Sequence, residues 1–185
     1  MTKWIDRGVM AWIEDRYLDD ESVLVFFKGT RLAAMTEGLV AQHRPPLAHG
    51  DDAEPGGWGA IVHHLHDPER NDFDPIDHRK LCPRGAQLMV FIPNPCLAKA
   101  HGPKAYHYED GRISSCIDYE DPDHVGEYWP NEMAPLIAAA GLGNEHERER
   151  EYDDHDDHDE RLTRLICDHL GLPALHREAF TVTAS

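Results

Sequence analysis

In the first half of the chain, the spacing of apolar residues changes from one segment to the next. Apolar side chains recur at helical spacing over residues 4–17, which predicts an amphipathic helix. The continuous β-prone run Val23–Phe27 is typical of a strand covered on both faces. A turn at Lys28-Gly29-Thr30 then leads to a second predicted strand over Leu32–Met35. Residues 43–57 are rich in Pro, Gly, Asp and His, which predicts a loop.

A strand and a short helix are predicted next, with candidate ligands on both. The strand runs from Trp58 to His66, and side chains two residues apart on a strand share a face. The members of that face are Ala60, Val62, His64 and His66. Asp74-Pro75 is a favourable helix start, with Asp as N-cap and Pro at the first helical position, so a short helix is expected to reach Leu81.

The second half adds further strands and two more helices. Leu88–Ile92 predicts another buried strand, and Glu109-Asp110-Gly111 predicts the turn of a hairpin. The strands of that hairpin are expected at Ala105–Tyr108 and Arg112–Tyr119. Helices are expected at Asn131–Ala140, although Pro135 weakens its middle, and at 159–170. This order predicts an α/β fold in which a mixed β-sheet is flanked by helices.

Charge and composition narrow the classes of partner. The formal net charge of -17 over 185 residues argues against binding a nucleic-acid backbone, which needs a basic face. Residues 145–160 contain ten acids and two arginines, and so carry -8 of that charge. A basic protein partner is one interpretation of this segment, and a solvated surface is the other. Because no long apolar segment or signal peptide is found, we expect no membrane contact and a cytoplasmic location.

His64, His66 and Asp77 are the candidate metal ligands. Two histidines at i and i+2 on a strand point the same way, so both imidazoles can reach one ion. Asp77 would sit in the first turn of the short helix, where a carboxylate is favoured and can lean toward the strand end. Two imidazoles and one carboxylate suit Zn²⁺ with a fourth position left for water. A shift of register by one residue would bring in His63 or His78 instead.

The segment Ile61-Val62-His63-His64-Leu65-His66-Asp67-Pro68, followed by Asp74-Pro75-Ile76-Asp77, resembles the JAMM zinc metalloprotease motif of MPN domains. That motif has an upstream glutamate, then His-x-His-Pro, then Ser-x-x-Asp. The resemblance covers roughly residues 4–120 and implies an MPN-type, cytidine-deaminase-like three-layer sandwich. It implies that His64, His66 and Asp77 hold zinc, with Glu21 as the general acid/base. It also implies a substrate that is a peptide or protein, including ubiquitin-like proteins, cleaved at a peptide or isopeptide bond.

Two departures from the motif keep other functions open. Asp67 stands where the family has Pro, and Asp74 stands at the position of its catalytic Ser. A carboxylate at Asp74 would repel the oxyanion that the serine stabilises. The alternatives are therefore a catalytically degenerate MPN-type domain that binds a protein, or an acidic decoy or inhibitor that mimics DNA. Glu37 is a rival to Glu21 as the general base.

The expected domain organisation is an MPN-like α/β domain over 1–142, an acidic His-rich linker or exposed helix over 143–158, and a C-terminal helix and tail over 159–185. The cluster His155-Asp156-Asp157-His158-Asp159 is expected to be solvated, with weak metal binding as the alternative. His101 and His107 are minor candidates for lining a cleft. Cysteines 82, 96, 116 and 167 are widely spaced and are expected to be free or buried thiols.

Overall fold

The structure is a computed structural model. It describes residues 22–50, 54–66, 76–93, 103–126, 129–143, 155–173 and 180–182. The helix predicted over 4–17 lies outside these residues. The described strands are β1 (Ser22–Lys28), β2 (Pro46–His49), β3 (Gly59–His64), β4 (Gln87–Ile92), β5 (Lys104–Glu109), β6 (Arg112–Asp118) and β7 (Thr181–Val182). The helices are α2 (Leu32–Ala41), the 3-10 helix η2 (His78–Leu81), α3 (Ala134–Ala139) and α4 (His155–Leu170).

The strands form one seven-stranded sheet in the order β6-β5-β4-β1-β3-β2-β7. Every pairing between them is antiparallel. The fold is α/β as predicted, but the expectation of a mixed sheet was wrong. The predicted order of helices and strands did not reveal that β3 and β4, which flank the short helix in the chain, lie on either side of β1 and each pair with it antiparallel.

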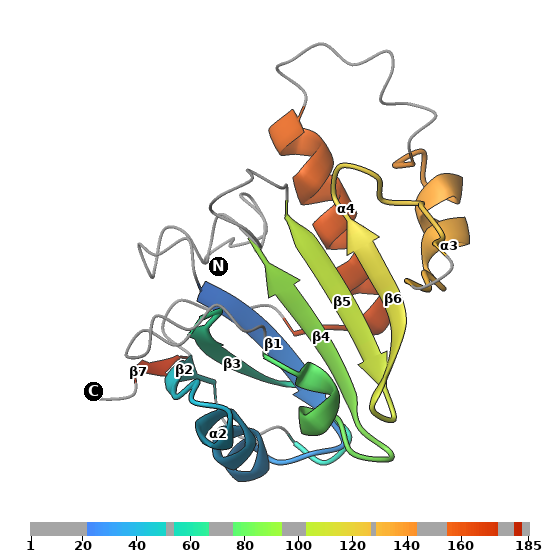
Figure 1. The fold of residues 1–185 in the computed structure, drawn as a ribbon. Helices are drawn as coiled ribbons and strands as arrows, with labels where there is room; N and C mark the ends of the chain where they lie inside the picture. The colour runs from blue at the N-terminus through green and yellow to red at the C-terminus, as the bar shows by residue number, and fades with distance from the viewer. Residues whose placement is uncertain are drawn as a thin grey trace.

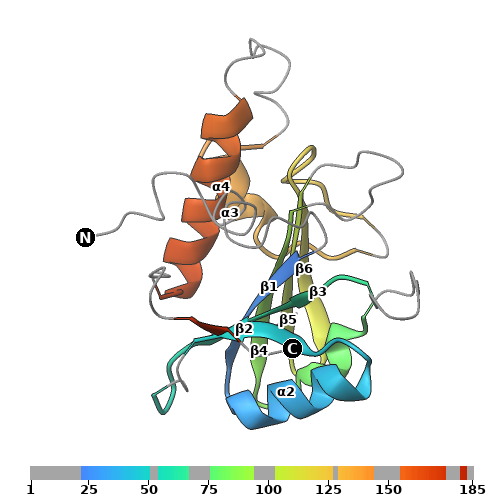
Figure 2. The same ribbon diagram turned by 90° about the vertical axis from the view of Figure 1, so that its left-hand side faces the viewer.

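Helices cover both faces of the sheet. In Figure 1, α4 passes behind β5 and β6, whereas η2 lies in front of β4. Figure 2 shows α2 and α4 well apart, with β1, β2 and β3 between them. The central strand β1 is therefore buried on both sides, and Val23 to Phe27 are all 0% exposed. This confirms the interpretation of the continuous apolar run as a doubly covered strand.

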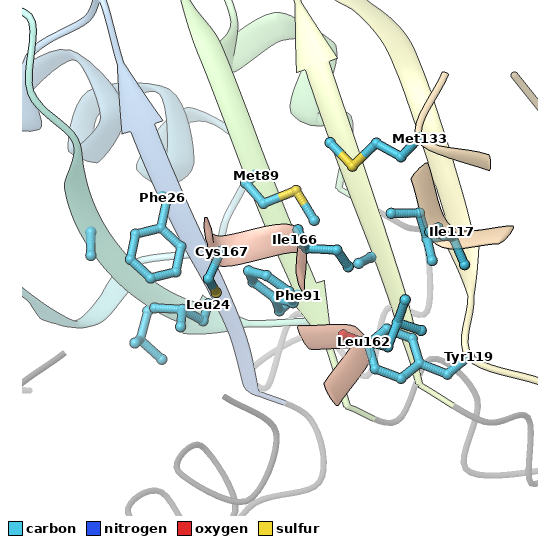
Figure 3. Close-up of a cluster of buried hydrophobic side chains, with 14 of the residues drawn as sticks. Leu24, Phe26, Met89, Phe91, Ile117, Tyr119, Met133, Leu162, Ile166 and Cys167 are labelled. Atoms are coloured by element: carbon cyan, nitrogen blue, oxygen red, sulfur yellow. The ribbon is translucent and has the colours of Figure 1, made fainter. Parts of the chain in front are cut away.

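Alternation along the strands separates two cores. Leu24 and Phe26 belong to the core on the α4 side, whose labelled members appear in Figure 3. There Leu162, Ile166 and Cys167 of α4 meet the side chains of β1, β4 and β6. Val23, Val25 and Phe27 belong to the core on the α2 side, with Met35 and Leu39 of α2 and Leu81 of η2. None of the described helices is both long and apolar enough to cross a membrane.

The prediction of a second strand at Leu32–Met35 is wrong, because these residues begin helix α2. Met35 and Leu39 are its buried residues, at the i, i+4 spacing of a helix face. The helix has no side-chain N-cap and contains Gly38, so local signals for it are weak. Packing on the sheet overrides that weak propensity.

The hairpin and the terminal helix follow the predictions closely. Asp110 (φ 51°) and Gly111 (φ 75°) both adopt positive φ between β5 and β6, as a two-residue type I′ turn requires. The strand predicted at Leu88–Ile92 is β4 with one more residue. The helix predicted at 159–170 begins earlier, at His155. The helix predicted at Asn131–Ala140 is shortened to α3, which places Pro135 in its first turn, where proline is tolerated.

Candidate functional site

The candidate site lies where β3 ends and β1 begins. The two strands are antiparallel neighbours, and Ser22, the first residue of β1, pairs with His64, the last residue of β3. His64 is partly buried and shares its face of β3 with Ala60 and Val62, which belong to the core on the α4 side. The Ser22 hydroxyl is buried, and no hydrogen-bond partner is found for it among the described residues. A buried hydroxyl therefore stands directly across from the first candidate ligand.

The prediction that the strand extends to His66 is wrong. β3 stops at His64, and Leu65 and His66 form a bend. The carbonyl of Leu65 accepts a hydrogen bond from Nε of Arg44 at 3.2 Å instead of continuing a strand ladder. Strand alternation therefore does not place His66 on the face of His64, and the expectation that Ala60, Val62, His64 and His66 share one face holds only as far as His64.

Asp77 has a different place in its helix from the one predicted. The described helix is η2, a 3-10 helix, and Asp77 is its N-cap, whose side chain accepts a hydrogen bond from the backbone N–H of Arg79. The carboxylate also forms an ion pair with the Arg79 guanidinium, with Nε–Oδ1 at 2.8 Å. The hydrogen bond from the Arg79 side chain holds the pKa of Asp77 below its usual value. Asp77 is therefore ionised at neutral pH, the state in which a carboxylate can bind a metal ion.

His63 and His78 meet in the core on the α2 side. Both rings are buried, and their Nε2 atoms lie 3.2 Å apart. Nδ1 of His63 lies 2.7 Å from the carbonyl oxygen of His64, so Nδ1 carries the hydrogen and Nε2 is an acceptor. Burial lowers the pKa of His63 to about 4 and that of His78 well below its usual value. Both imidazoles are therefore neutral, and His78 donates from Nε2 to His63.

The predicted metal ligands His64, His66 and Asp77 are not brought together into one group. No three His, Cys, Asp or Glu side chains in the described ranges come together closely enough to hold a metal ion. Glu21 and Asp74, the predicted catalytic residues, lie outside the described residues, as does Asp67. Glu37 is exposed on α2, on the side opposite the buried Met35 and Leu39, which removes the support for it as a rival base.

The minor candidates take separate positions. His107 is buried beside Ser114, with Nδ1 and Oγ 2.7 Å apart, and His101 lies outside the described residues. His158 of the acidic cluster is buried, and its Nε2 lies 3.1 Å from the carbonyl of Leu142. It is therefore a structural residue rather than a solvated one. Of the acidic segment 145–160, residues 145–154 lie outside the described residues.

The described cysteines are free thiols with little tendency to ionise. Cys82 and Cys167 are buried and Cys116 is partly buried, as expected from their spacing. Burial raises the pKa of all three, and that of Cys167 reaches about 12. Because the thiolate is the nucleophile, these three residues are poor candidates for catalysis.

Comparisons with models of protein families, with curated proteins and with solved structures found no match to this chain. The arguments about function therefore rest on the residues themselves and on their arrangement.

Proposed function

We propose that this chain is a JAMM-like zinc-dependent hydrolase of the cytoplasm that cleaves a peptide or isopeptide bond. His64, His66 and Asp77 are the zinc ligands, and Glu21 is the general acid/base. The observation that carries the proposal is the meeting of three chain segments at one end of the sheet. The pairing of Ser22 with His64 brings the start of β1 to the end of β3. The contact of His63 with His78 brings the residue after Asp77 to the same end of the sheet, on the face opposite to the one that His64 shares with Ala60 and Val62.

The donor set fits zinc in its chemistry. Imidazole nitrogen and carboxylate oxygen are ordinary zinc ligands, and three protein ligands leave a position for water. When bound, zinc acidifies that water enough for it to attack a carbonyl near neutral pH. Glu21 directly precedes Ser22, the partner of His64, so its sequence position suits a group that accepts the proton. The MPN-type three-layer arrangement belongs to the same proposal.

Arg79 is the group that competes with zinc for Asp77. Its side chain is 62% exposed, and an ion pair this exposed contributes little to stability. Structural zinc sites bind their metal with about 10 kcal/mol or more. The ion pair is therefore too weak to keep the Asp77 carboxylate from a zinc ion.

The decisive experiment is metal analysis of the full chain purified without chelator. We expect stoichiometric zinc, its loss in His64→Ala and Asp77→Asn, and chelator-sensitive cleavage of a peptide or an isopeptide-linked ubiquitin-like protein. His124→Ala is the matched control, because the His124 side chain is 63% exposed and pairs with Asp121 outside the site. Wild-type protein that neither contains nor takes up zinc would contradict the proposal.

A catalytically degenerate domain of the same type is the second candidate. The observation that favours it is the engagement of the Asp77 carboxylate by Arg79, together with acids at positions 67 and 74 in place of the family's Pro and Ser. This function requires the same fold without zinc. It predicts a protein partner that binds wild type and a His64→Ala/His66→Ala double variant equally well.

A further inference from the structure

The loop between β6 and α3 carries exposed apolar side chains. Its described residues are 119–126 and 129–133, and in Figure 1 it runs outside β6, the strand at one edge of the sheet. Val125 is 64% exposed and Trp129 is 53% exposed. Among the described residues, the other large apolar side chains this exposed lie singly, Val40 on α2 and Val182 on β7. Exposed apolar side chains that gather in one place mark a contact surface.

The loop is held in shape by the buried amide of Asn131. Nδ2 of Asn131 donates to the carbonyl of Pro122 at 2.9 Å and to that of His124 at 3.3 Å. Oδ1 of Asn131 accepts a hydrogen bond from the N–H of Met133 at 3.2 Å. The two arms of the loop are therefore joined to each other. A surface that is ordered before its partner arrives binds without the cost of ordering the chain.

Trp129 is supported from the sheet and open to solvent. Its backbone N–H donates to the carbonyl of Gly126, and the N–H of Gly126 donates back, both at 3.3 Å. The next carbonyl, that of Pro130, accepts from the N–H of Cys116 on β6 at 2.7 Å. The indole meets the ring of Tyr106 on β5 edge to face, with centroids 6.4 Å apart. One part of the indole is therefore fixed against the sheet, while more than half of the residue remains accessible.

Negative charge surrounds this aromatic surface. Residues 113–143 contain six acids and no lysine or arginine. The carboxylate of Asp121 is 41% exposed and lies 3.4 Å from Nδ1 of His124. A Cβ on Gly126 would lie 3.3 Å from Nε2 of His124 and 3.9 Å from Cβ of Trp129, so both side chains border the same glycine. A carboxylate is thus linked to the indole through one imidazole ring.

Charge selects the class of partner. A second copy of the chain carries the same net charge of -17, and nucleic acids and anionic membranes carry phosphates, so each is repelled. An arginine or lysine is attracted both by the carboxylates and by the face of an indole. Trp58 shows that contact within this chain, with Nζ of Lys28 5.7 Å from the centre of its ring. Lys104, beside Tyr106 in sequence, is paired with Asp118 at 2.8 Å.

We propose that the β6–α3 loop binds an arginine-rich segment of a basic protein. The guanidinium of one arginine stacks on the indole of Trp129, and the carboxylate of Asp121 attracts the positive charge. The aliphatic stem of the arginine contacts Val125. Asn131 is a positioning residue that does not touch the partner. This function is independent of the proposed hydrolase, and the surface is separate from the acidic segment 145–160.

The direct test is nuclear magnetic resonance of the full chain, with isotope at the tryptophan nitrogens and an oligo-arginine peptide as the probe. The chain has four tryptophans, and the Trp129→Phe variant identifies the indole signal of Trp129. We expect that signal to shift on titration, while the indole of Trp58, which donates to the carbonyl of Leu170 at 3.1 Å, stays in place. Oligo-lysine of the same length should shift it less, because an ammonium is more strongly hydrated than a guanidinium.

Variants separate the indole from the general charge of the molecule. Trp129→Leu keeps an apolar side chain without an aromatic face, and should weaken oligo-arginine binding by about two- to fivefold. Trp129→Phe should keep most of the affinity. Asp121→Asn keeps an oxygen for His124 and removes one charge, so it should weaken binding more than its matched control, Glu54→Gln, which removes an exposed carboxylate before β3.

Three results would overturn the proposal. The first is an indole signal of Trp129 that does not move when oligo-arginine is added. The second is equal affinity in wild type, Trp129→Leu and Trp129→Phe, or an equal loss in Asp121→Asn and Glu54→Gln, since the peptide then binds by net charge alone. The third is self-association in sedimentation that Trp129→Leu abolishes, which would assign the loop to a second copy. Should Trp129→Leu fail to fold by circular dichroism, the wild-type titration and the two charge variants decide.

Discussion

His43 adopts a backbone conformation that usually belongs to glycine. Its φ is 59°, and it occupies the position just beyond the C-cap of α2 in the Schellman motif. A residue with a Cβ costs about 1–2 kcal/mol of stability in the left-handed region. Glycine avoids this cost, but the flexibility that it adds to the unfolded chain lowers stability by about 0.5–1 kcal/mol.

We therefore expect His43→Gly to raise the free energy of unfolding by about 0.5–1 kcal/mol. His43 is exposed, so no core contact is lost, and the carbonyl that accepts from Arg44 remains. Urea denaturation followed by circular dichroism measures the change. His43→Ala is the control, because alanine keeps the Cβ and should bring no gain. A lower stability in the glycine variant would mean that the His43 side chain itself supports the turn.

The roles of single histidines were the part of the site least accessible from the sequence. Both faces of β3 are covered, so Ile61-His63 and Val62-His64 give two equally apolar alternations. The pattern placed His64 on one face of β3 with Ala60 and Val62, as found, but gave no reason for His63 and His78 to meet. Gln42 and Arg44 carry no sequence signal for their contacts with Asp77 and Leu65, because each of these contacts joins residues more than twenty positions apart.

At the scale of elements, α2 and η2 pack closely at Gly38. A Cβ on Gly38 would collide with Cδ2 of Leu81, which is buried in the core on the α2 side. The missing side chain lets α2 approach η2, and the same approach brings Gln42 within reach of Asp77.

A larger residue at this position should push the two elements apart. We expect Gly38→Val to lower the free energy of unfolding by about 1–3 kcal/mol through overpacking. The matched control is Ala34→Val, at an exposed position one turn earlier on α2, where valine lowers helix propensity relative to alanine without the collision. Thermal denaturation of both variants gives the comparison, and a Gly38→Val variant as stable as wild type would refute the close approach.

The elements predicted well are those with strong local signals. The Asp110-Gly111 pair marks a hairpin turn, the continuous apolar run marks β1, and helical spacing marks the terminal helix. α2 lacked such signals, and the helix-start signal at Asp74-Pro75 did not mark the start of η2, which begins at His78. α2 has weak helix formers and no capping side chain, and η2 is a single 3-10 turn whose start is set by tertiary contacts with Gln42 and His63.

On the scale of the whole molecule, acidic pH acts through a few buried neutral groups as well as through the net charge of -17. His107 lies on β5 in the core on the α4 side and is 5% exposed. Burial lowers its pKa to about 4, although the nearby Glu132 carboxylate opposes the shift. The native protein therefore keeps His107 neutral at a pH where an unfolded chain, with a histidine pKa of about 6.5, is protonated.

This difference fixes the sign of the pH dependence. Between pH of about 6.5 and 4 the unfolded state binds more protons at His107, so the free energy of unfolding falls as the pH falls. At about 1.4 kcal/mol per pKa unit, lowering the pH from 7 to 4.5 should cost about 2 kcal/mol through this residue. His107→Asn keeps a polar group near Ser114 but cannot titrate, so its stability should fall by about 2 kcal/mol less than that of wild type over the same range.

The comparison isolates His107 from the rest of the charge. Protonation of the acidic side chains and of the buried His63 changes the stability of both proteins alike, and subtraction removes it. Urea unfolding at closely spaced pH values supplies the two curves. Parallel curves would mean that His107 is protonated in the native core. The carboxylate that the structure pairs with it there is that of Glu109, whose Oε1 lies 3.9 Å from Nε2 of His107. If the two curves diverge only below about pH 6.5, His107 takes up its proton in the unfolded chain and stays neutral in the native core, as burial of the ring requires.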